Sequence, residues 1–185
     1  MSTDTTPRIA VIYATSQGST RDIAEFLAAD LTARGARVQL ADAEHAPDPT
    51  TYDVLVVGSA VHDMDVLPEA AAYLTHHRHE LADHDVHMFT VGLGPALRGP
   101  IGRWMGRTVP PKIATLRDAI EAGDFHAFAG RYEHDGVPVK ARLIYRLMGG
   151  GRYGDLRDWT DIRAWSAEIG NSLGLAPAQA APPHP

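Results

Sequence analysis

The sequence predicts a doubly wound α/β domain built on a five-stranded parallel sheet with helices on both faces. Two observations support this prediction. Short apolar runs of strand length alternate with stretches of helical periodicity, and the first runs are almost continuously Val, Ile and Leu. Strands with this composition are covered on both faces, as in parallel sheets flanked by helices. A chain of 185 residues with 44% hydrophobic residues suits one such core better than two.

Four apolar runs mark the expected strands, and a fifth, weaker run alternates between apolar and polar residues. The four runs are residues 9–14, 54–61, 86–92 and 127–132. Residues 37–41 form the alternating run, which favours a position at the edge of the sheet. Five strands joined by helices suit the strand order 2-1-3-4-5, in which ligands bind beyond the carboxyl ends of the first and third strands.

Helical periodicity separates these runs. The expected helices are residues 20–34, 67–79, 111–122 and 160–173. Each carries apolar residues at spacings that form one buried face. Residue preferences at helix ends agree with these bounds, because Gly35 follows the first helix and Pro68 and Pro111 suit first helical turns. Asp158 or Thr160 is expected to cap the last helix.

One domain is expected at residues 8–173, between two disordered tails. Residues 1–7 are polar and lack the apolar core of a signal peptide, whereas residues 174–185 are rich in Ala and Pro. Nowhere do about 18 consecutive apolar residues occur, as a membrane span would need. The protein is therefore expected in the cytoplasm, at most peripheral to the inner face of the membrane.

Composition excludes several classes of function. The formal net charge of -6 disfavours nucleic-acid binding, since no overall basic field would attract a polyanion. The absence of cysteine excludes disulfides and thiol chemistry, so redox work would require a bound cofactor. No metal site is predicted among the ten histidines, because neighbours such as His76, His77 and His79 do not share one helical face.

The loop after the first strand has the composition of a phosphate site. It consists of Thr15, Ser16, Gln17, Gly18, Ser19 and Thr20. Four hydroxyls, a glycine that permits close backbone approach and a helix N-terminus can together hold a phosphate dianion. The same residues also suit an ordinary N-cap, and this alternative stays open. A Walker loop and a dinucleotide fingerprint are both absent.

Residues 13–24, which read YATSQGSTRDIA, resemble the FMN phosphate loop and first helix of flavodoxins. Residues 52–60, YDVLVVGSA, resemble the third strand of the same family and its following loop. The segment 132–159, with its Gly149-Gly150 and Asp158-Trp159 pairs, is similar to the insertion of menaquinone-dependent protoporphyrinogen dehydrogenases, enzymes of heme biosynthesis. The flavodoxin-like resemblance covers residues 8–173.

This resemblance implies FMN as the cofactor, with its phosphate on residues 15–20 and its ring between the loops after the third and fourth strands. The implied ring contacts are Ser59, Ala60, Val61, His62, Gly92, Leu93 and Gly94. Flavodoxins sandwich the ring between aromatic residues, whereas these loops offer His62, Met64 and Trp104. A more open flavin face suits an enzyme that admits a bulky substrate. Catalytic residues are not identified.

Two functions follow from the resemblance. The first is an FMN-dependent oxidoreductase that oxidises protoporphyrinogen IX with a quinone as acceptor. Arg98, Arg103 and Arg107 would then contact the propionates, although a solvated basic loop is an alternative. Residues 137–148 form a basic amphipathic pattern that suits a membrane surface or packing on the sheet. The second function is a flavodoxin-type electron carrier that docks on a redox partner protein. A scaffold that has lost FMN is a third reading.

Overall fold

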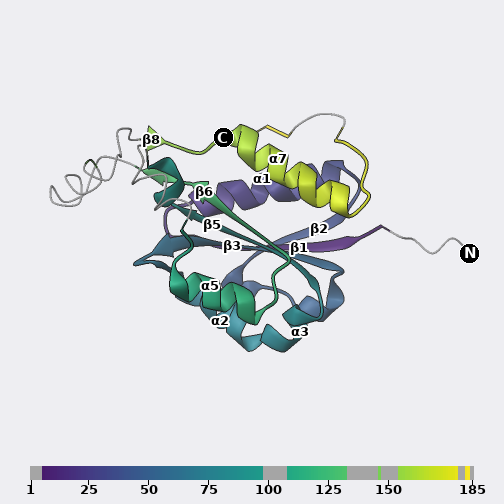
Figure 1. Ribbon diagram of the computed structural model, residues 1–185. Coiled ribbons are helices and arrows are strands. Elements are labelled where there is room, and N and C mark those ends of the chain that lie inside the picture. Colours follow the sequence, from purple (N-terminus) through teal and green to yellow (C-terminus); the bar gives the residue numbers. More distant parts are fainter. Residues whose placement is uncertain (1–5, 98–107, 133–145, 147–153, 179–181, 184–185) are drawn as a thin grey trace, which may run out of the picture.

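A parallel sheet with helices on both faces forms the centre of the computed structural model (Figure 1). The structure describes residues 6–97, 108–132, 146, 154–178 and 182–183. The strands of the sheet are β1 (Arg8–Ala14), β2 (Arg37–Asp42), β3 (Val54–His62), β5 (Asp85–Gly92) and β6 (Asp124–Ala129). Their order is β2-β1-β3-β5-β6, with all neighbouring pairs parallel. This confirms the predicted fold and strand order, including the edge position of the alternating strand.

In the described part of the chain, five helices cover the sheet. They are α1 (Ser19–Ala33), α2 (Pro68–His76), α3 (Arg78–Ala82), α5 (Pro111–Ala119) and α7 (Trp159–Ser172). Helices α1 and α7 lie on one face, and α2, α3 and α5 lie on the other (Figure 1). Side chains alternate between the faces, so Ile9 and Val11 join the core under α1 and α7, whereas Ala10 and Ile12 join the opposite core. Three single-turn 3-10 helices occur in loops: η1 (Ala43–His45), η2 (Pro49–Thr51) and η3 (Gly94–Ala96).

The predicted helix ends are mostly confirmed. Pro68 and Pro111 each open a helix, and the Asp158 carboxylate accepts hydrogen bonds from the backbone N–H groups of Thr160 (3.0 Å) and Asp161 (3.2 Å). Asp158 is therefore the cap of α7. The single helix predicted at residues 67–79 is wrong, because His77 leaves the helical region (φ −98°, ψ 17°) and separates α2 from α3.

The last strand begins earlier than the apolar run 127–132 indicated, because Phe125 and His126 are also part of β6. Gly130 ends this strand. Beyond it, β7 (Arg131–Tyr132) leaves the main sheet and pairs antiparallel with β8 (Gly154–Asp155). The predicted insertion 132–159 starts at this small sheet, and most of it lies outside the described residues.

The chain after α7 remains in contact with the core at its start. The Leu175 N–H donates to the Gly170 carbonyl at 2.9 Å, and the Leu175 side chain packs against the cluster under α1 and α7. The domain boundary at residue 173 stays a prediction. Across the described ranges, no helix is long and apolar enough to cross a membrane.

The central strands approach closely at Gly58. It pairs with Phe89 in the parallel ladder, and a Cβ atom on Gly58 would lie 2.0 Å from the Phe89 ring. The ring is fully buried and packs at 5.9 Å from Phe128 and 5.8 Å from Trp165, measured between centroids. Glycine at position 58 is therefore what allows this aromatic cluster to lie flat against the sheet.

Arg157 ties the segment after β8 to the first turn of α1. Its guanidinium Nη1 lies 2.8 Å from Asp22 Oδ2, and its Nε and Nη2 donate to Asp155 at 2.8 and 2.7 Å. The guanidinium also stacks 4.7 Å above the Trp159 ring, which in turn contacts Phe26. The hydrogen bonds from Arg157 lower the pKa of the Asp155 carboxyl. This network holds the entry to α7 against α1.

We predict that Gly58→Ala destabilises the protein by about 1–3 kcal/mol, the usual cost of overpacking a core. The added methyl group would force the Phe89 ring out of place. Urea denaturation of the apoprotein measures the effect. The double variant Gly58→Ala/Phe89→Leu should lose less stability than the sum of the two single variants, since the smaller side chain makes room. Strict additivity would contradict this account.

We also predict a pH-dependent contribution from the pair between Arg157 and Asp155. Because the folded pKa of Asp155 is lowered, its stabilisation is complete above the unfolded pKa of about 3.9 and is lost as the pH falls through the lower folded value. Asp155→Asn should therefore be less stable than the wild type at neutral pH, and the gap should close below about pH 4. Chemical denaturation across the acid range tests this. A gap that stays constant would contradict it.

Candidate functional site

The carboxyl ends of β1, β3 and β5 meet at one edge of the sheet. In the ladder, Ala14 pairs with Ser59, and Ala60 pairs with Val91. The loops that follow these strands therefore lie side by side, as the predicted strand order required. All of the predicted cofactor contacts belong to these three loops or to the strand ends beside them.

Gly18 shapes the loop between β1 and α1. It occupies the N-cap of α1 in the left-handed region (φ 92°), where glycine is favoured. Its N–H donates to Thr15 Oγ1 at 2.9 Å, which closes the loop on itself. Since glycine has no side chain, α1 has no side-chain cap. The N-cap alternative for this sequence is therefore wrong, and the first N–H groups of α1 remain for another acceptor.

Thr20 has a buried hydroxyl in the first turn of the same helix. The residue is fully buried, and its Oγ1 has no hydrogen-bond partner in the described part of the chain. Leaving such a group unsatisfied costs about 1–3 kcal/mol. Ser16 and Gln17 are exposed, and Ser19 is half-buried. An uncapped helix, a left-handed glycine and an orphaned hydroxyl together fit the phosphate of FMN.

Near the end of β3, the Ser59 hydroxyl is paired with backbone groups and not left for a ligand. It is buried, its hydroxyl donates to the Ala60 carbonyl at 2.9 Å, and it accepts the Leu67 N–H at 2.9 Å. These two bonds fold the loop back toward α2. Ala60 and Val61 are half-buried beside it, and the His62 side chain is 77% exposed. The structure thus places these four predicted contacts in the last four residues of β3, with the Ser59 hydroxyl already occupied.

A short hairpin in this loop was not predicted. Strand β4 (Asp65–Val66) runs antiparallel to the end of β3, and the turn between them has positive φ at both Asp63 (48°) and Met64 (63°). Turns of this kind favour Asn or Asp followed by Gly; Asp63 suits the first position, but Met64 stands where Gly is expected, so the sequence signal is incomplete. Lys112 Nζ lies 3.0 Å from Asp65 Oδ2 and joins the hairpin to α5. The turn holds Met64 at 60% exposure.

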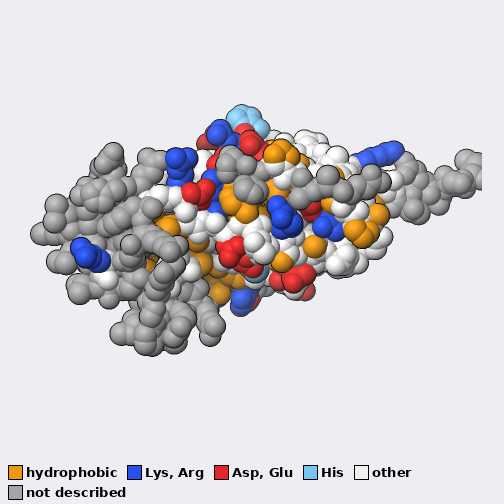
Figure 2. Space-filling model, turned by 90° about the horizontal axis from the view of Figure 1, so that it is seen from above, with side chains coloured by type: hydrophobic (Ala, Val, Ile, Leu, Met, Phe, Trp, Pro, Cys, Tyr) orange, Lys and Arg blue, Asp and Glu red, His pale blue; other side chains and the backbone are white. Residues whose placement is uncertain are grey.

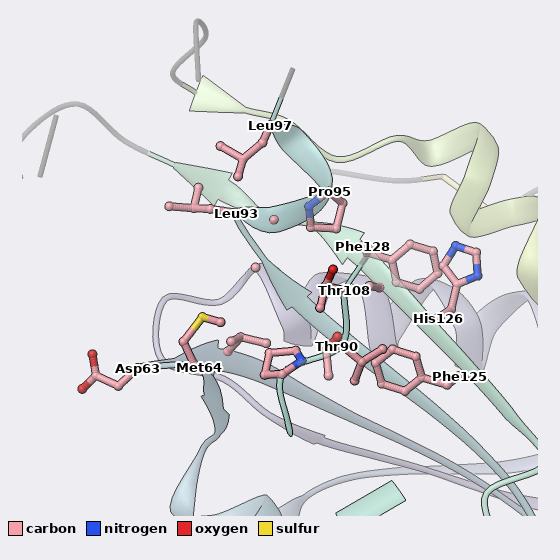
Figure 3. Close-up of a pocket in the computed structure, with 16 residues that line it drawn as sticks. Asp63, Met64, Thr90, Leu93, Pro95, Leu97, Thr108, Phe125, His126 and Phe128 are labelled. Carbon is pink, nitrogen blue, oxygen red and sulfur yellow. The ribbon is translucent and has the colours of Figure 1, made fainter. Parts of the chain in front are cut away.

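An apolar pocket of about 590 Å³ opens between the loops after β3 and β5 and extends along β6. Its lining consists of Val61, Asp63, Met64, Thr90, residues 92–95, Leu97 and residues 108–110 and 125–128. Figure 3 shows Met64 at one end and the rings of Phe125, His126 and Phe128 at the other. The two loops approach closely, because a Cβ on Gly92 would lie 3.3 Å from Val61 Cβ.

The pocket therefore brings together four predicted ring contacts: Val61, Gly92, Leu93 and Gly94. Ser59, Ala60, His62 and residues 15–20 do not line it. Sequence reasoning missed the contribution of β6, whose Phe125 and Phe128 supply aromatic walls. Polar Asp124 and His126 interrupt the apolar run at the start of β6, so the run in the sequence begins only at Ala127. The predicted aromatic candidate Trp104 lies outside the described residues.

One group of possible metal ligands is present in the described ranges. Asp42, Glu44 and His45 place their ligand atoms within 4.8 Å of one another at the end of β2. The Asp42 carboxylate caps η1 and lies 2.8 Å from His45 Nδ1, and this hydrogen bond lowers the pKa of Asp42 and raises that of His45. Local capping accounts for the arrangement. It lies away from the apolar pocket and shares no residue with its lining.

Solved structures similar to this chain have the same fold at low sequence identity. Rubredoxin oxygen:oxidoreductase from Desulfovibrio gigas is 15% identical, with a TM-score of 0.57; the match covers 92% of this chain and 37% of that one. A flavodoxin mutant from Pseudomonas aeruginosa is 12% identical, covers 90% of this chain and 99% of its own, and has a TM-score of 0.57. Oxidised flavodoxin 2 from Bacillus cereus is 17% identical, with coverages of 90% and 97% and a TM-score of 0.55.

No curated protein matches the sequence significantly. The family comparison is more informative, since the model of the flavodoxin domain matches residues 10–155, which include the phosphate loop, the loops after β3 and β5 and the whole of β6. The site geometry agrees with this match, because the uncapped α1 and the Thr20 hydroxyl fit a phosphate. The chain therefore belongs to the flavodoxin domain family, and its cofactor is FMN.

Proposed function

We propose that this protein is an FMN-dependent oxidoreductase that oxidises a bulky porphyrinogen, such as protoporphyrinogen IX, and passes the electrons to a quinone such as menaquinone. The observation that supports this proposal is the apolar pocket of about 590 Å³ beside the flavin loops. Bound FMN would supply the redox chemistry by accepting two electrons from a reduced substrate and returning them to a second acceptor.

The pocket is large enough for a small-molecule ligand in addition to the edge of a flavin ring. Its volume lies within the range of about 300–1,000 Å³ that is usual for small-molecule sites. Leu93, Pro95 and Leu97 line one side of the pocket with hydrocarbon, and Phe125 and Phe128 add aromatic surface from opposite faces of β6 (Figure 3). Such surfaces contact a tetrapyrrole or a quinone ring through apolar area without any requirement for charge. Within the described ranges, the lining combines these surfaces with few polar groups, chiefly Thr90, Thr108, His126 and Asp63.

Met64 is the side chain best placed to contact a ring on the open side. It lines the pocket from a left-handed turn position that non-glycine residues rarely adopt. Methionine packs adaptably against aromatic surfaces through its thioether. Figure 3 shows Met64 directed along the pocket and Asp63 directed away from it. A flexible contact of this kind supports an enzyme with an open flavin face over a carrier with a rigid aromatic sandwich.

Two parts of the proposal rest on sequence alone. Arg98, Arg103 and Arg107 belong to the loop after β5 and lie outside the described residues; we propose that they contact substrate propionates. Segment 137–148 also lies outside them, apart from the exposed Arg146. We propose that its basic residues bring the protein to an anionic membrane surface, where quinones are found.

The carrier alternative needs a docking face for a redox protein. Figure 2 shows acidic, basic and apolar side chains interspersed over the described residues of the face that carries α7. Complementary docking is favoured by a patch of one sign. This face therefore gives the carrier reading no specific support, and the turnover experiment below decides between the two functions.

Thr20→Val should weaken FMN binding by about tenfold or more, because a hydrogen bond to a charged group contributes about 1.5–3 kcal/mol. Riboflavin, which lacks the phosphate, should bind with nearly unchanged affinity. Thr32→Val is the matched control, since Thr32 lies on the same helix and its hydroxyl bonds to the Ala28 carbonyl. Fluorescence titration of both flavins gives the affinities. Equal weakening of FMN and riboflavin would show that Thr20 is structural.

The FMN-loaded protein should oxidise protoporphyrinogen with menadione as acceptor under anaerobic conditions. Accumulation of the fluorescent porphyrin measures turnover, and protein without flavin is the control. The opposite result is also informative. A flavin-loaded protein that exchanges single electrons rapidly with a reductase but does not oxidise the porphyrinogen is a carrier, and the proposal would then be wrong.

Met64→Gly should raise the KM for the porphyrinogen several-fold while leaving the apoprotein as stable as the wild type or more stable. Glycine relieves a left-handed strain of about 1–2 kcal/mol and loses about 0.5–1 kcal/mol through greater freedom of the unfolded chain. Met64→Leu keeps the apolar volume and should retain a KM close to that of the wild type. Steady-state kinetics and urea denaturation test both variants. A KM unaffected by Met64→Gly would remove Met64 from the substrate site.

A further inference from the structure

Asp22 places a negative charge where the cofactor phosphate is expected. It lies in the first turn of α1, and its N–H donates to the Gly18 carbonyl at 3.0 Å. Its side chain is 22% exposed, so solvent screens its charge incompletely. An acidic residue stabilises an empty helix N-terminus, but it repels a second anion bound at the same terminus. A phosphate dianion therefore requires that the charge of Asp22 be compensated.

Arg157 is the group that provides this compensation. Its Nη1 lies 2.8 Å from Asp22 Oδ2, and its side chain is only 2% exposed. The other edge of the guanidinium is fixed by Asp155, and its face lies on Trp159. Both Asp22 and Asp155 raise the pKa of Arg157, so the charge is permanent. A buried, fully oriented cation of this kind acts over a longer range than an exposed one.

The position of this cation relative to the phosphate loop is fixed by Gly130. The Leu156 N–H donates to the Gly130 carbonyl at 3.3 Å, and a Cβ on Gly130 would lie 3.2 Å from Ser19 Oγ. The segment 155–157 therefore lies over the loop that begins α1. No side chain larger than that of glycine fits at position 130 without displacing Ser19 or Val91.

We propose that Arg157 is a positioning residue for the cofactor, which makes the N-terminus of α1 selective for a phosphorylated flavin by neutralising Asp22. It acts through Asp22 and not by direct contact with the phosphate. The inference rests on FMN binding at this terminus and is independent of the proposed porphyrinogen substrate, so the turnover experiment does not affect it.

A cycle of four proteins tests the proposal: the wild type, Arg157→Met, Asp22→Asn and the double variant. For each, fluorescence titration gives the Kd of FMN and of riboflavin, and the ratio of the two constants isolates the phosphate. Arg157→Met should reduce the preference for FMN by about tenfold, since Asp22 and Asp155 then lose their shared cation and Asp22 repels the phosphate. Asp22→Asn should increase the preference, because Arg157 then has one carboxylate fewer beside it, and the double variant should restore it to near the wild-type value.

The Arg157→Lys variant separates the effect of the positive charge from the effect of the hydrogen bonds to Asp22 and Asp155. Lysine keeps the positive charge but cannot bridge two carboxylates as the planar guanidinium does. The preference for FMN should therefore survive, whereas the free energy of unfolding should fall. Should Arg157→Met fail to fold, Asp155→Asn gives a second measurement: with one carboxylate fewer beside the guanidinium, the preference for FMN should increase, and more so at low salt.

Several outcomes would overturn the proposal. An FMN preference unchanged by Arg157→Met would make Arg157 purely structural. A preference lost in Arg157→Met and not restored in the double variant would mean that Arg157 contacts the phosphate directly. If the wild type bound riboflavin as tightly as FMN, the phosphate would not lie at α1 at all. Finally, a preference unchanged or lowered by Asp155→Asn would show that local charge does not control phosphate affinity.

Discussion

β1, β3 and β5 carry helices on both faces, so most of their residues must be apolar, with His87 and Thr90 as buried polar residues within β5. Each crossover returns the chain to the same end of the sheet, because successive parallel strands run in one direction. The three carboxyl ends and their loops are therefore brought together by the packing requirement alone. The site for FMN is a consequence of how the core is buried, and Gly58 permits the tight packing of Phe89 behind it.

The sequence predicted those features that depend on local patterns. The strand order, the edge position of β2, the prolines at the starts of α2 and α5 and the cap at Asp158 all follow from periodicity or from single-residue preferences. Features fixed by tertiary contact were missed. The start of β6 includes the polar His126, whose ring bonds to Asp161 and stacks on Phe128, so burial came from partners distant in the chain. In the turn at Asp63 and Met64, Met64 adopts a positive φ that its residue type disfavours.

The residues of the site also fall into two groups: those that a local sequence pattern reveals and those that only tertiary contacts reveal. Residues 15–20 could be recognised because a phosphate site needs glycine, hydroxyls and a helix start in one continuous stretch. Arg157 could not, because its partner Asp22 is 135 positions away in the chain and no local signal distinguishes it from other arginines. The role of Ser59 was equally hidden. Its hydroxyl satisfies backbone groups of its own loop, and only the folded geometry shows which polar groups are already paired.

Some locally unfavourable features of the described ranges lie on the cofactor side of the molecule, whereas the ring nitrogens of His87, which lack a hydrogen-bond partner in these ranges, lie near the start of β5, at the other end of the sheet. Helix α1, like α2, α3 and α5, has no side-chain cap, and the Thr20 hydroxyl in its first turn lacks a partner in the described ranges. Two non-glycine residues in the left-handed region, Asp63 and Met64, lie in the loop after β3. Each feature costs free energy in the protein without ligand, and unfavourable local geometry of this kind persists where function requires it. A bound anion would satisfy the free N–H groups of α1 and the Thr20 hydroxyl, so cofactor binding is expected to stabilise the fold at the positions where the protein alone is weakest.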